Sequence, residues 1–222
     1  MQKIIIKKIQ GESRMEVFLI NSNDESDLDF IKEFSKKLSE NKSVLLLSFT
    51  RKENKNIEDL YDMGGMITYD ICDYFLGLID LDKIIVSGRE NIDFVIPPLI
   101  NSKYQIKKED IFKLLEKINS HDYLIINGLD KGLIDNKKVV DIINENQLED
   151  EIKADFFFIN SDDKYFDIRE YRDEILGKSS KFVGLKEKDS SYDKIISNIL
   201  DDKSEEIQKI GFFEKLKKKL AQ

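Results

Sequence analysis

A polar turn after the first apolar run holds the residues best placed for phosphate or metal chemistry. It reads Asn21, Ser22, Asn23, Asp24, Glu25, Ser26 and Asp27, and a stretch with helical spacing follows it. A turn between a strand and a helix binds phosphate when glycines expose backbone N–H groups and a lysine reaches the anion. This turn has neither glycine nor lysine, and its carboxylates would repel a triphosphate. The pattern favours an N-capped helix start with Asp27 as the cap, and a magnesium site built from the same carboxylates is the alternative.

The single histidine and the single cysteine limit other kinds of catalysis. One histidine, His121, argues against a zinc site or a His-based triad, and no motif sets a nucleophile beside it. We expect His121 to have a surface or strand-capping role. Cys72 has apolar neighbours, so we expect a small buried side chain rather than a reactive thiol. The sequence therefore predicts no catalytic residue, no metal site and no cofactor.

Two kinds of segment alternate along the chain and would position these residues. Short apolar runs predict strands at Glu16–Asn21, Ser43–Phe49, Ile92–Pro97, Tyr123–Asn127, Asp155–Asn160 and Lys181–Val183. Helical spacing predicts helices at Asp27–Ser39, Ile67–Gly77, Lys108–Asn119, Val139–Asn144, Phe166–Leu176 and Tyr192–Leu200. Ile84–Ser87 and Ile92–Ile96 could instead form a local hairpin, and we expect the polar run Arg51–Asp59 to be a mobile surface loop.

This alternation predicts an α/β fold in three layers, with a mostly parallel, doubly wound sheet. The 222 residues suffice for one such domain, which we assign to residues 15–203. Residues 1–14 form an N-terminal extension whose isoleucines either add an edge strand or belong to a disordered arm. Residues 204–222 form a basic amphipathic C-terminal helix.

The charge distribution narrows the possible partners. The chain has a net charge of −8, and its last fifteen residues carry five lysines against one glutamate, so residues 1–207 hold −12. An acidic body repels nucleic acid, so we expect no DNA or RNA partner. No apolar run reaches the length of a membrane span, and the N-terminus lacks the features of a signal peptide. These features predict a cytoplasmic protein.

Several segments, in order, resemble the MinD/ParA family of deviant Walker ATPases. The residues that carry the resemblance are VLLLSFTRKENKNIEDLYDMGGMITYDICDYFLGLIDLDKII from Val44, then NIDFVIPPL, IFKLLEKINSHDYLIING and the terminal GFFEKLKKKL. They match the family's strand, its "tYDvLeG" helix, its "nLdvlPa" and "fDyiiiDsp" strands and its membrane helix. The resemblance covers roughly residues 16–200 and the tail, and it implies a P-loop NTPase-like fold.

The chain departs from this family at the positions that carry the chemistry. The family's P-loop falls on Asn21–Asp29, where its glycines and lysine are missing. Ser48 stands where the family has acidic residues after the second strand, and Asn127 stands where it has an aspartate. Losing the phosphate and metal contacts together removes the electrostatic stabilisation that phosphoryl transfer needs. The resemblance with these departures predicts a pseudo-ATPase.

The predicted function is therefore that of a non-catalytic, membrane-associated scaffold or positioning protein with a protein partner or a homodimer. Two alternatives stay open. One is a divergent MinD-like switch that still binds and hydrolyses ATP. The other is a soluble regulatory module resembling a receiver domain whose phospho-accepting aspartate is replaced by Asn127.

The C-terminal residues predict a membrane contact. A helix from Gly211 would set four apolar side chains on one face, namely Phe212, Phe213, Leu216 and Leu220. Three lysines, Lys215, Lys217 and Lys219, would flank this face. Such a pattern is typical of a helix lying on anionic lipid, and it predicts a peripheral protein at the inner face of the cell membrane. Packing on the protein's own sheet or on a protein partner are the alternatives.

Overall fold

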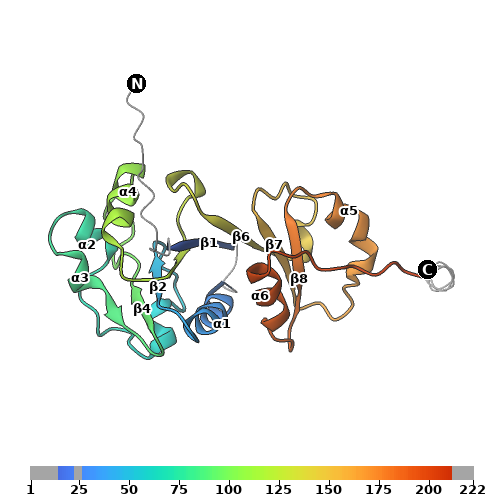
Figure 1. Ribbon diagram of the computed structural model, residues 1–222, viewed down its shortest axis with the longest axis horizontal. Helices are drawn as coiled ribbons and strands as arrows, with labels where there is room; N and C mark the ends of the chain where they lie inside the picture. Colours follow the sequence, from blue (N-terminus) through green and yellow to red (C-terminus); the bar gives the residue numbers. More distant parts are fainter. Residues whose placement is uncertain (1–14, 23–26, 212–222) are drawn as a thin grey trace, which may run out of the picture.

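One eight-stranded sheet runs through the computed structural model, which describes residues 15–22 and 27–211. Figure 1 shows the arrangement of its strands and helices. The strand order is β3-β4-β2-β5-β1-β6-β7-β8, and every neighbouring pair is parallel except β3 with β4. The strands are β1 (Glu16–Ser22), β2 (Val44–Ser48), β3 (Val86–Ser87), β4 (Ile92–Val95), β5 (Tyr123–Asn127), β6 (Lys138–Ile143), β7 (Phe156–Ser161) and β8 (Lys181–Glu187). The predicted mostly parallel, three-layer α/β fold is confirmed.

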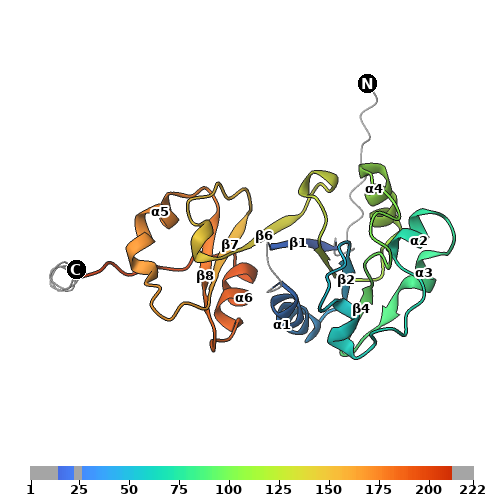
Figure 2. The ribbon, with the colours of Figure 1, turned by 180° about the vertical axis from the view of Figure 1, so that it is seen from behind.

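Helices cover both faces of the sheet. On one face lie α1 (Asp27–Ser39), α6 (Asp193–Leu200) and the 3₁₀ turn η1 (Ile57–Tyr61). On the other lie α2 (Ile71–Phe75), α3 (Leu81–Ile84), α4 (Lys108–Lys117) and α5 (Arg172–Gly177). Three further 3₁₀ turns are η2 (Lys131–Leu133), η3 (Glu145–Gln147) and η4 (Ile168–Tyr171). Figure 2 shows the same arrangement from behind, and α1 and α6 lie together on one side of the sheet.

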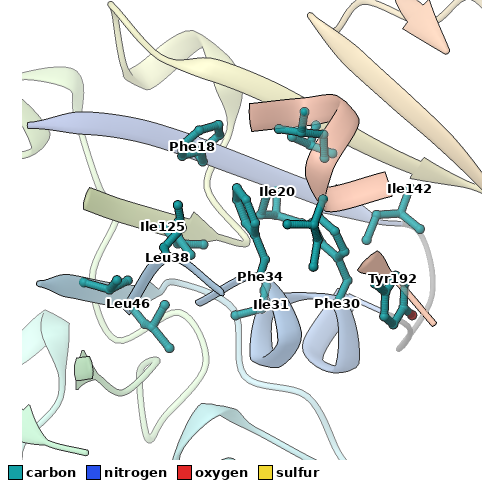
Figure 3. Packing of buried hydrophobic residues seen from close by; sticks show 14 of the residues in the cluster. Phe18, Ile20, Phe30, Ile31, Phe34, Leu38, Leu46, Ile125, Ile142 and Tyr192 are labelled. Carbon is teal, nitrogen blue, oxygen red and sulfur yellow. The ribbon is translucent and has the colours of Figure 1, made fainter. Parts of the chain in front are cut away.

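The hydrophobic core is divided by the sheet, because successive strand residues point to opposite faces. In β1, Phe18 and Ile20 face α1, whereas Val17 and Leu19 face α4. On the first face the rings of Phe30 and Phe34 reach across from α1 to the strand residues (Figure 3). The apolar runs that predicted buried strands thus supply both cores.

One predicted helix is wrong. Val139–Asn144 was expected to be helical, but these residues form most of β6, which pairs with β1 on one side and β7 on the other. The run is short and rich in β-branched residues, and a strand buried on both faces has no alternating pattern to distinguish it from a helix. The hairpin considered for Ile84–Ser87 with Ile92–Ile96 is confirmed in part: Val86 and Ser87 form β3 and pair antiparallel with β4, whereas Ile84 ends α3.

Residues 51–59 are anchored, which corrects the prediction of a mobile surface loop. Arg51 donates to the carbonyl oxygen of Pro98 at 2.9 Å and pairs with the buried Glu58 at 2.9 Å. The side-chain amide of Asn56 donates to the carbonyl oxygen of Lys52, and its oxygen accepts from the Lys52 N–H. Residues 53–55 stay exposed, but Arg51, Asn56 and Glu58 therefore fix this run to itself and to the loop after β4.

The C-terminal part of the described chain packs against β8 and α5 without regular secondary structure. Residues 204–211 are not helical, although we expected the C-terminal helix to begin at residue 204. Ile207 is buried in the core beside α5, and the Glu205 N–H donates to the carbonyl oxygen of Phe182 on β8. The eleven residues from 212 on lie outside the described residues, so the amphipathic helix stays a prediction. In the part of the chain that is described, no helix is long and apolar enough to cross a bilayer.

Candidate functional site

The candidate site lies where the carboxyl ends of β1, β5 and β2 meet, as expected for a doubly wound sheet. Asn127, at the end of β5, is in register with Ile20 of β1 and with Ser48 of β2. Both Ser48 and Asn127 are buried, and the N–H of Phe49 donates to the carbonyl oxygen of Asn127 at 2.9 Å. The structure thus brings together the two positions at which the sequence departs from the acidic residues of the MinD/ParA family.

A close contact between two loops fixes the backbone just beyond these strands. Gly128 has φ +72°, and a Cβ there would lie 2.5 Å from the Thr50 hydroxyl oxygen. That hydroxyl donates to the carbonyl oxygen of Gly128 at 2.9 Å. Only glycine tolerates both this conformation and this approach. The loops after β2 and β5 are therefore held against each other.

The start of α1 carries an ion pair that the sequence did not predict. Asp27 is the first residue of α1 and is 2% exposed, and its carboxylate binds the Lys52 ammonium from the loop after β2. The capping role of Asp27 stays a prediction, and the structure shows that its side chain joins α1 to another loop. Of the rest of the turn, Asn21 and Ser22 end β1, and Asn23, Asp24, Glu25 and Ser26 lie outside the described residues.

A pocket of about 410 Å³ opens beside this edge, between the ends of β1, β5 and β6. Four carboxylates and one lysine are among its lining side chains: Asp130, Asp141, Asp150, Glu151 and Lys131. The amide of Asn21 donates to Asp141 at 2.9 Å across the strand pair β1–β6. A pocket with this excess of negative charge disfavours a polyanion such as a nucleotide triphosphate.

No group of three or more His, Cys, Asp or Glu side chains arranged to hold a metal ion occurs in residues 15–22 and 27–211. His121 lies at the opposite, amino end of β5, where its Nε2 is 3.0 Å from Asp93 and its Nδ1 is 3.0 Å from the hydroxyl of Ser120. It joins the connection before β5 to β4, and its side chain is only 6% exposed, so its role is structural but not that of a surface residue.

The Thr-Tyr-Asp segment that contributed to the family resemblance has a structural role at α2. Asp70 is fully buried, caps α2 through the N–H groups of Cys72 and Asp73, and accepts from the N–H of Leu99. The Lys103 ammonium pairs with the carboxylates of Asp70 and Asp73. Burial alone would lower the pKa of Lys103, but the hydrogen bonds to Asp73 and Asp70 outweigh it and raise that pKa. This network fixes the loop after β4.

Two residues of the site were not predicted from the sequence. Asp141 falls in the segment that we predicted as a helix, so its place beside Asn21 became visible only when β6 paired with β1. Lys52 lies in the run that we predicted as a surface loop. No short-range pattern indicates its partner, since Asp27 is 25 residues away.

Comparison of the structure with solved ones identifies the fold. A plasmid partition protein from Borrelia burgdorferi is similar at 16% identity with a TM-score of 0.64, over 85% of this chain and 99% of that one. A chain of the MinC:MinD cell division complex from Aquifex aeolicus is similar at 16% identity and a TM-score of 0.61, over 88% of this chain and 100% of that one. The septum site-determining protein MinD from Pyrococcus horikoshii, in complex with Mg-ADP, is similar at 14% identity with a TM-score of 0.60. The similarity covers 82% of this chain and 86% of that one.

These similarities show that the chain has the fold of the MinD/ParA-type ATPases, which confirms at the level of the fold the resemblance found in the sequence. No protein-family model matches the sequence. No curated protein matches it either. The observed strand order also differs from the 2-1-3-4-5 order of receiver-like folds, so the chain does not have the receiver-like fold.

Proposed function

We propose that this chain is a non-catalytic relative of the MinD/ParA ATPases that acts as a scaffold or positioning protein. The observation that carries the proposal is the ion pair of Asp27 with Lys52 at the start of α1. At that helix start an ATPase of this fold needs free backbone N–H groups and a lysine directed at the phosphates. Here a carboxylate occupies the first turn and holds a lysine from another loop.

Three further features support the loss of nucleotide chemistry. Ser48 and Asn127 carry no charge at the strand ends where a metal would need carboxylates. The pocket between β1, β5 and β6 is lined by four carboxylates and one lysine. The turn before α1 has no glycine. Phosphoryl transfer depends on positioning and charge stabilisation together, so the combined losses remove the basis for catalysis.

Nucleotide titration tests this proposal against the divergent ATPase alternative. Isothermal titration of the full chain with ATP and with ADP, each with and without magnesium, should give no binding heat. A variant with a lysine introduced into residues 21–26 should not release phosphate from ATP, because the neutral residues Ser48 and Asn127 still stand where carboxylates would be needed. Micromolar or tighter nucleotide binding, or phosphate release by that variant, would show that the divergent switch is the correct function.

The same proposal includes peripheral binding to the inner face of the cell membrane. The apolar face of Phe212, Phe213, Leu216 and Leu220 and the lysines Lys215, Lys217 and Lys219 support it. Partial burial of four such side chains supplies roughly 3–6 kcal/mol, and each lysine near anionic lipid adds about 1 kcal/mol. Ordering of the helix and repulsion of the acidic body oppose binding, so a single copy should bind weakly.

A homodimer or a protein partner would strengthen this binding by raising the effective concentration of the second tail. The MinC:MinD cell division complex, one chain of which shares this fold, supports an assembly of this kind. Co-sedimentation with anionic vesicles should compare the full chain with a truncation after Lys209 and with Phe213→Asp. Salt-sensitive binding by the full chain alone is expected. Equal sedimentation of all three, or none by an artificially dimerised full chain, would contradict the membrane role.

A further inference from the structure

An apolar groove lies on the α4 face of the sheet, away from the candidate site. Its volume is about 380 Å³, and it runs between α4 and the η2 connection above the amino end of β1. Its floor is formed by Met15 and Val17, and its α4 wall includes Phe112 and Leu115. Phe112 is 63% exposed, which is unusual for a phenylalanine beside a core.

The groove exists because one helix of the layer is missing. The connection from β5 to β6 crosses β1, which lies between those two strands in the sheet. Parallel crossovers of this kind usually contain a helix that covers the crossed strand. This connection spans residues 128–137 and has only the three-residue turn η2, so part of the β1 face is left open.

We infer that the groove is a docking site for the N-terminal segment of the same chain, residues 1–10. This segment contains Ile4, Ile5, Ile6 and Ile9, a concentration of apolar side chains that needs a surface to cover. The described chain begins at Met15, which itself lines the groove. Since at most six peptide units separate Ile9 from Met15, Ile9 lies within about 21 Å of the groove floor.

Charge favours the same occupant. The segment carries Lys3, Lys7 and Lys8 and no acidic residue. The groove is lined by two carboxylates, Glu116 and Asp135, against one lysine. That lysine, Lys108, is already paired with Asp135 at 2.8 Å, so the Glu116 carboxylate is the charge most open to a lysine of the segment. The docked segment would take the place of the missing helix and would cover Phe112.

Hydrogen exchange of the full chain, measured by mass spectrometry, tests this docking. Amides of residues 4–10 should exchange at least tenfold more slowly in the unchanged protein than in Phe112→Asp. Tyr165→Asp is the matched control, because Tyr165 is an aromatic residue 81% exposed outside the groove. It should leave the protection of residues 4–10 unchanged. Both substitutions lie on the surface, and unchanged exchange of the sheet amides checks that each variant is folded.

A fluorescence measurement gives an independent answer, since the chain has no tryptophan. The emission of Ile5→Trp should shift to the red when Phe112→Asp is added, and not when Tyr165→Asp is added. Residues 4–10 exchanging at the unprotected rate in the unchanged chain would overturn the proposal. Protection that survives Phe112→Asp would also overturn it and would point to an edge strand. Protection that disappears on dilution would instead indicate exchange of segments between two copies and would contradict docking within one chain.

Discussion

Asp27 at the start of α1 holds the Lys52 ammonium from the loop after β2, although the two residues are far apart in the sequence. The carboxylate is almost fully buried, and the lysine side chain is 18% exposed. Such a pair resists separation, because either charge left alone in the interior would be poorly solvated. The first helix and the loop after β2 are therefore joined at the edge of the sheet where the strand ends converge.

The first prediction concerns this pair. As a simple helix cap, Asp27 would contribute about 1 kcal/mol. As half of a buried ion pair it contributes more, and Asp27→Ala should lower the free energy of unfolding by about 3 kcal/mol. Urea denaturation measures this difference. Asp29→Ala is the control, because Asp29 pairs with Lys55 at an exposed position and should cost under about 1 kcal/mol. Equal losses for the two variants would contradict the buried pair.

The second prediction concerns Arg51, whose guanidinium pairs with the buried Glu58. One Glu58 oxygen, Oε2, has no hydrogen-bond partner among the described residues, so Arg51 is the main compensation for this carboxylate. Arg51→Ala should lower the free energy of unfolding by about 3 kcal/mol, and Glu58→Leu added to it should restore most of the loss. Arg89→Ala removes an exposed pair with Asp62 and should change stability by under about 1 kcal/mol. A double variant no more stable than Arg51→Ala would show that charge compensation is not the cause.

The third prediction separates backbone strain from steric contact at glycine. Gly128→Ala should destabilise the fold by more than about 2 kcal/mol, because it combines a positive φ with a clash against Thr50. Gly65 also has a positive φ but no atom within 4 Å of its Cβ position, so Gly65→Ala should cost about 1 kcal/mol. Gly177→Ala has neither problem and should be neutral or slightly stabilising. In thermal denaturation, Gly128→Ala should have the lowest Tm, Gly65→Ala an intermediate one and Gly177→Ala the highest. A Gly128→Ala variant as stable as Gly65→Ala would show that the contact with Thr50 does not contribute.

The fourth prediction concerns pH. Burial, with a smaller contribution from the Asp70 charge, raises the pKa of the Cys72 thiol from 9.0 to about 11. Above pH 9 the unfolded chain releases this proton while the folded chain retains it, so ionisation favours the unfolded state. The contribution of Cys72 to stability is complete below pH 9 and is lost between pH 9 and 11, by up to about 2–3 kcal/mol.

Urea denaturation at pH 8 and at pH 10.5 measures this loss. Cys72→Ala should show a smaller decrease over the same interval than the unchanged protein. Tyr61, whose pKa burial raises to about 12, is present in both proteins and therefore cancels in the comparison. Identical decreases in the two proteins would show that the Cys72 thiol does not titrate differently in the folded state.

The sequence by itself determined the fold class and most of the elements. The helix Asp27–Ser39 was predicted with the same bounds as α1, because its apolar residues recur at helical spacing and so lie on one face of the helix. The apolar runs of β1, β2 and β5 were also recognised, since strands buried on both faces are almost continuously apolar. The absence of a glycine- and lysine-containing turn could be read directly, because a phosphate-binding turn is a local feature.

Only the tertiary structure decided which residues meet. Val139–Asn144 has the composition of either a strand or a short helix, and pairing with β1 and β7 settles it as β6. Asp27 with Lys52 and Asn21 with Asp141 are contacts between segments that no local pattern connects. The groove beside α4 arises from a crossover that lacks a helix. Such features depend on the order of strands in the sheet, which long-range packing selects and short-range periodicity does not encode.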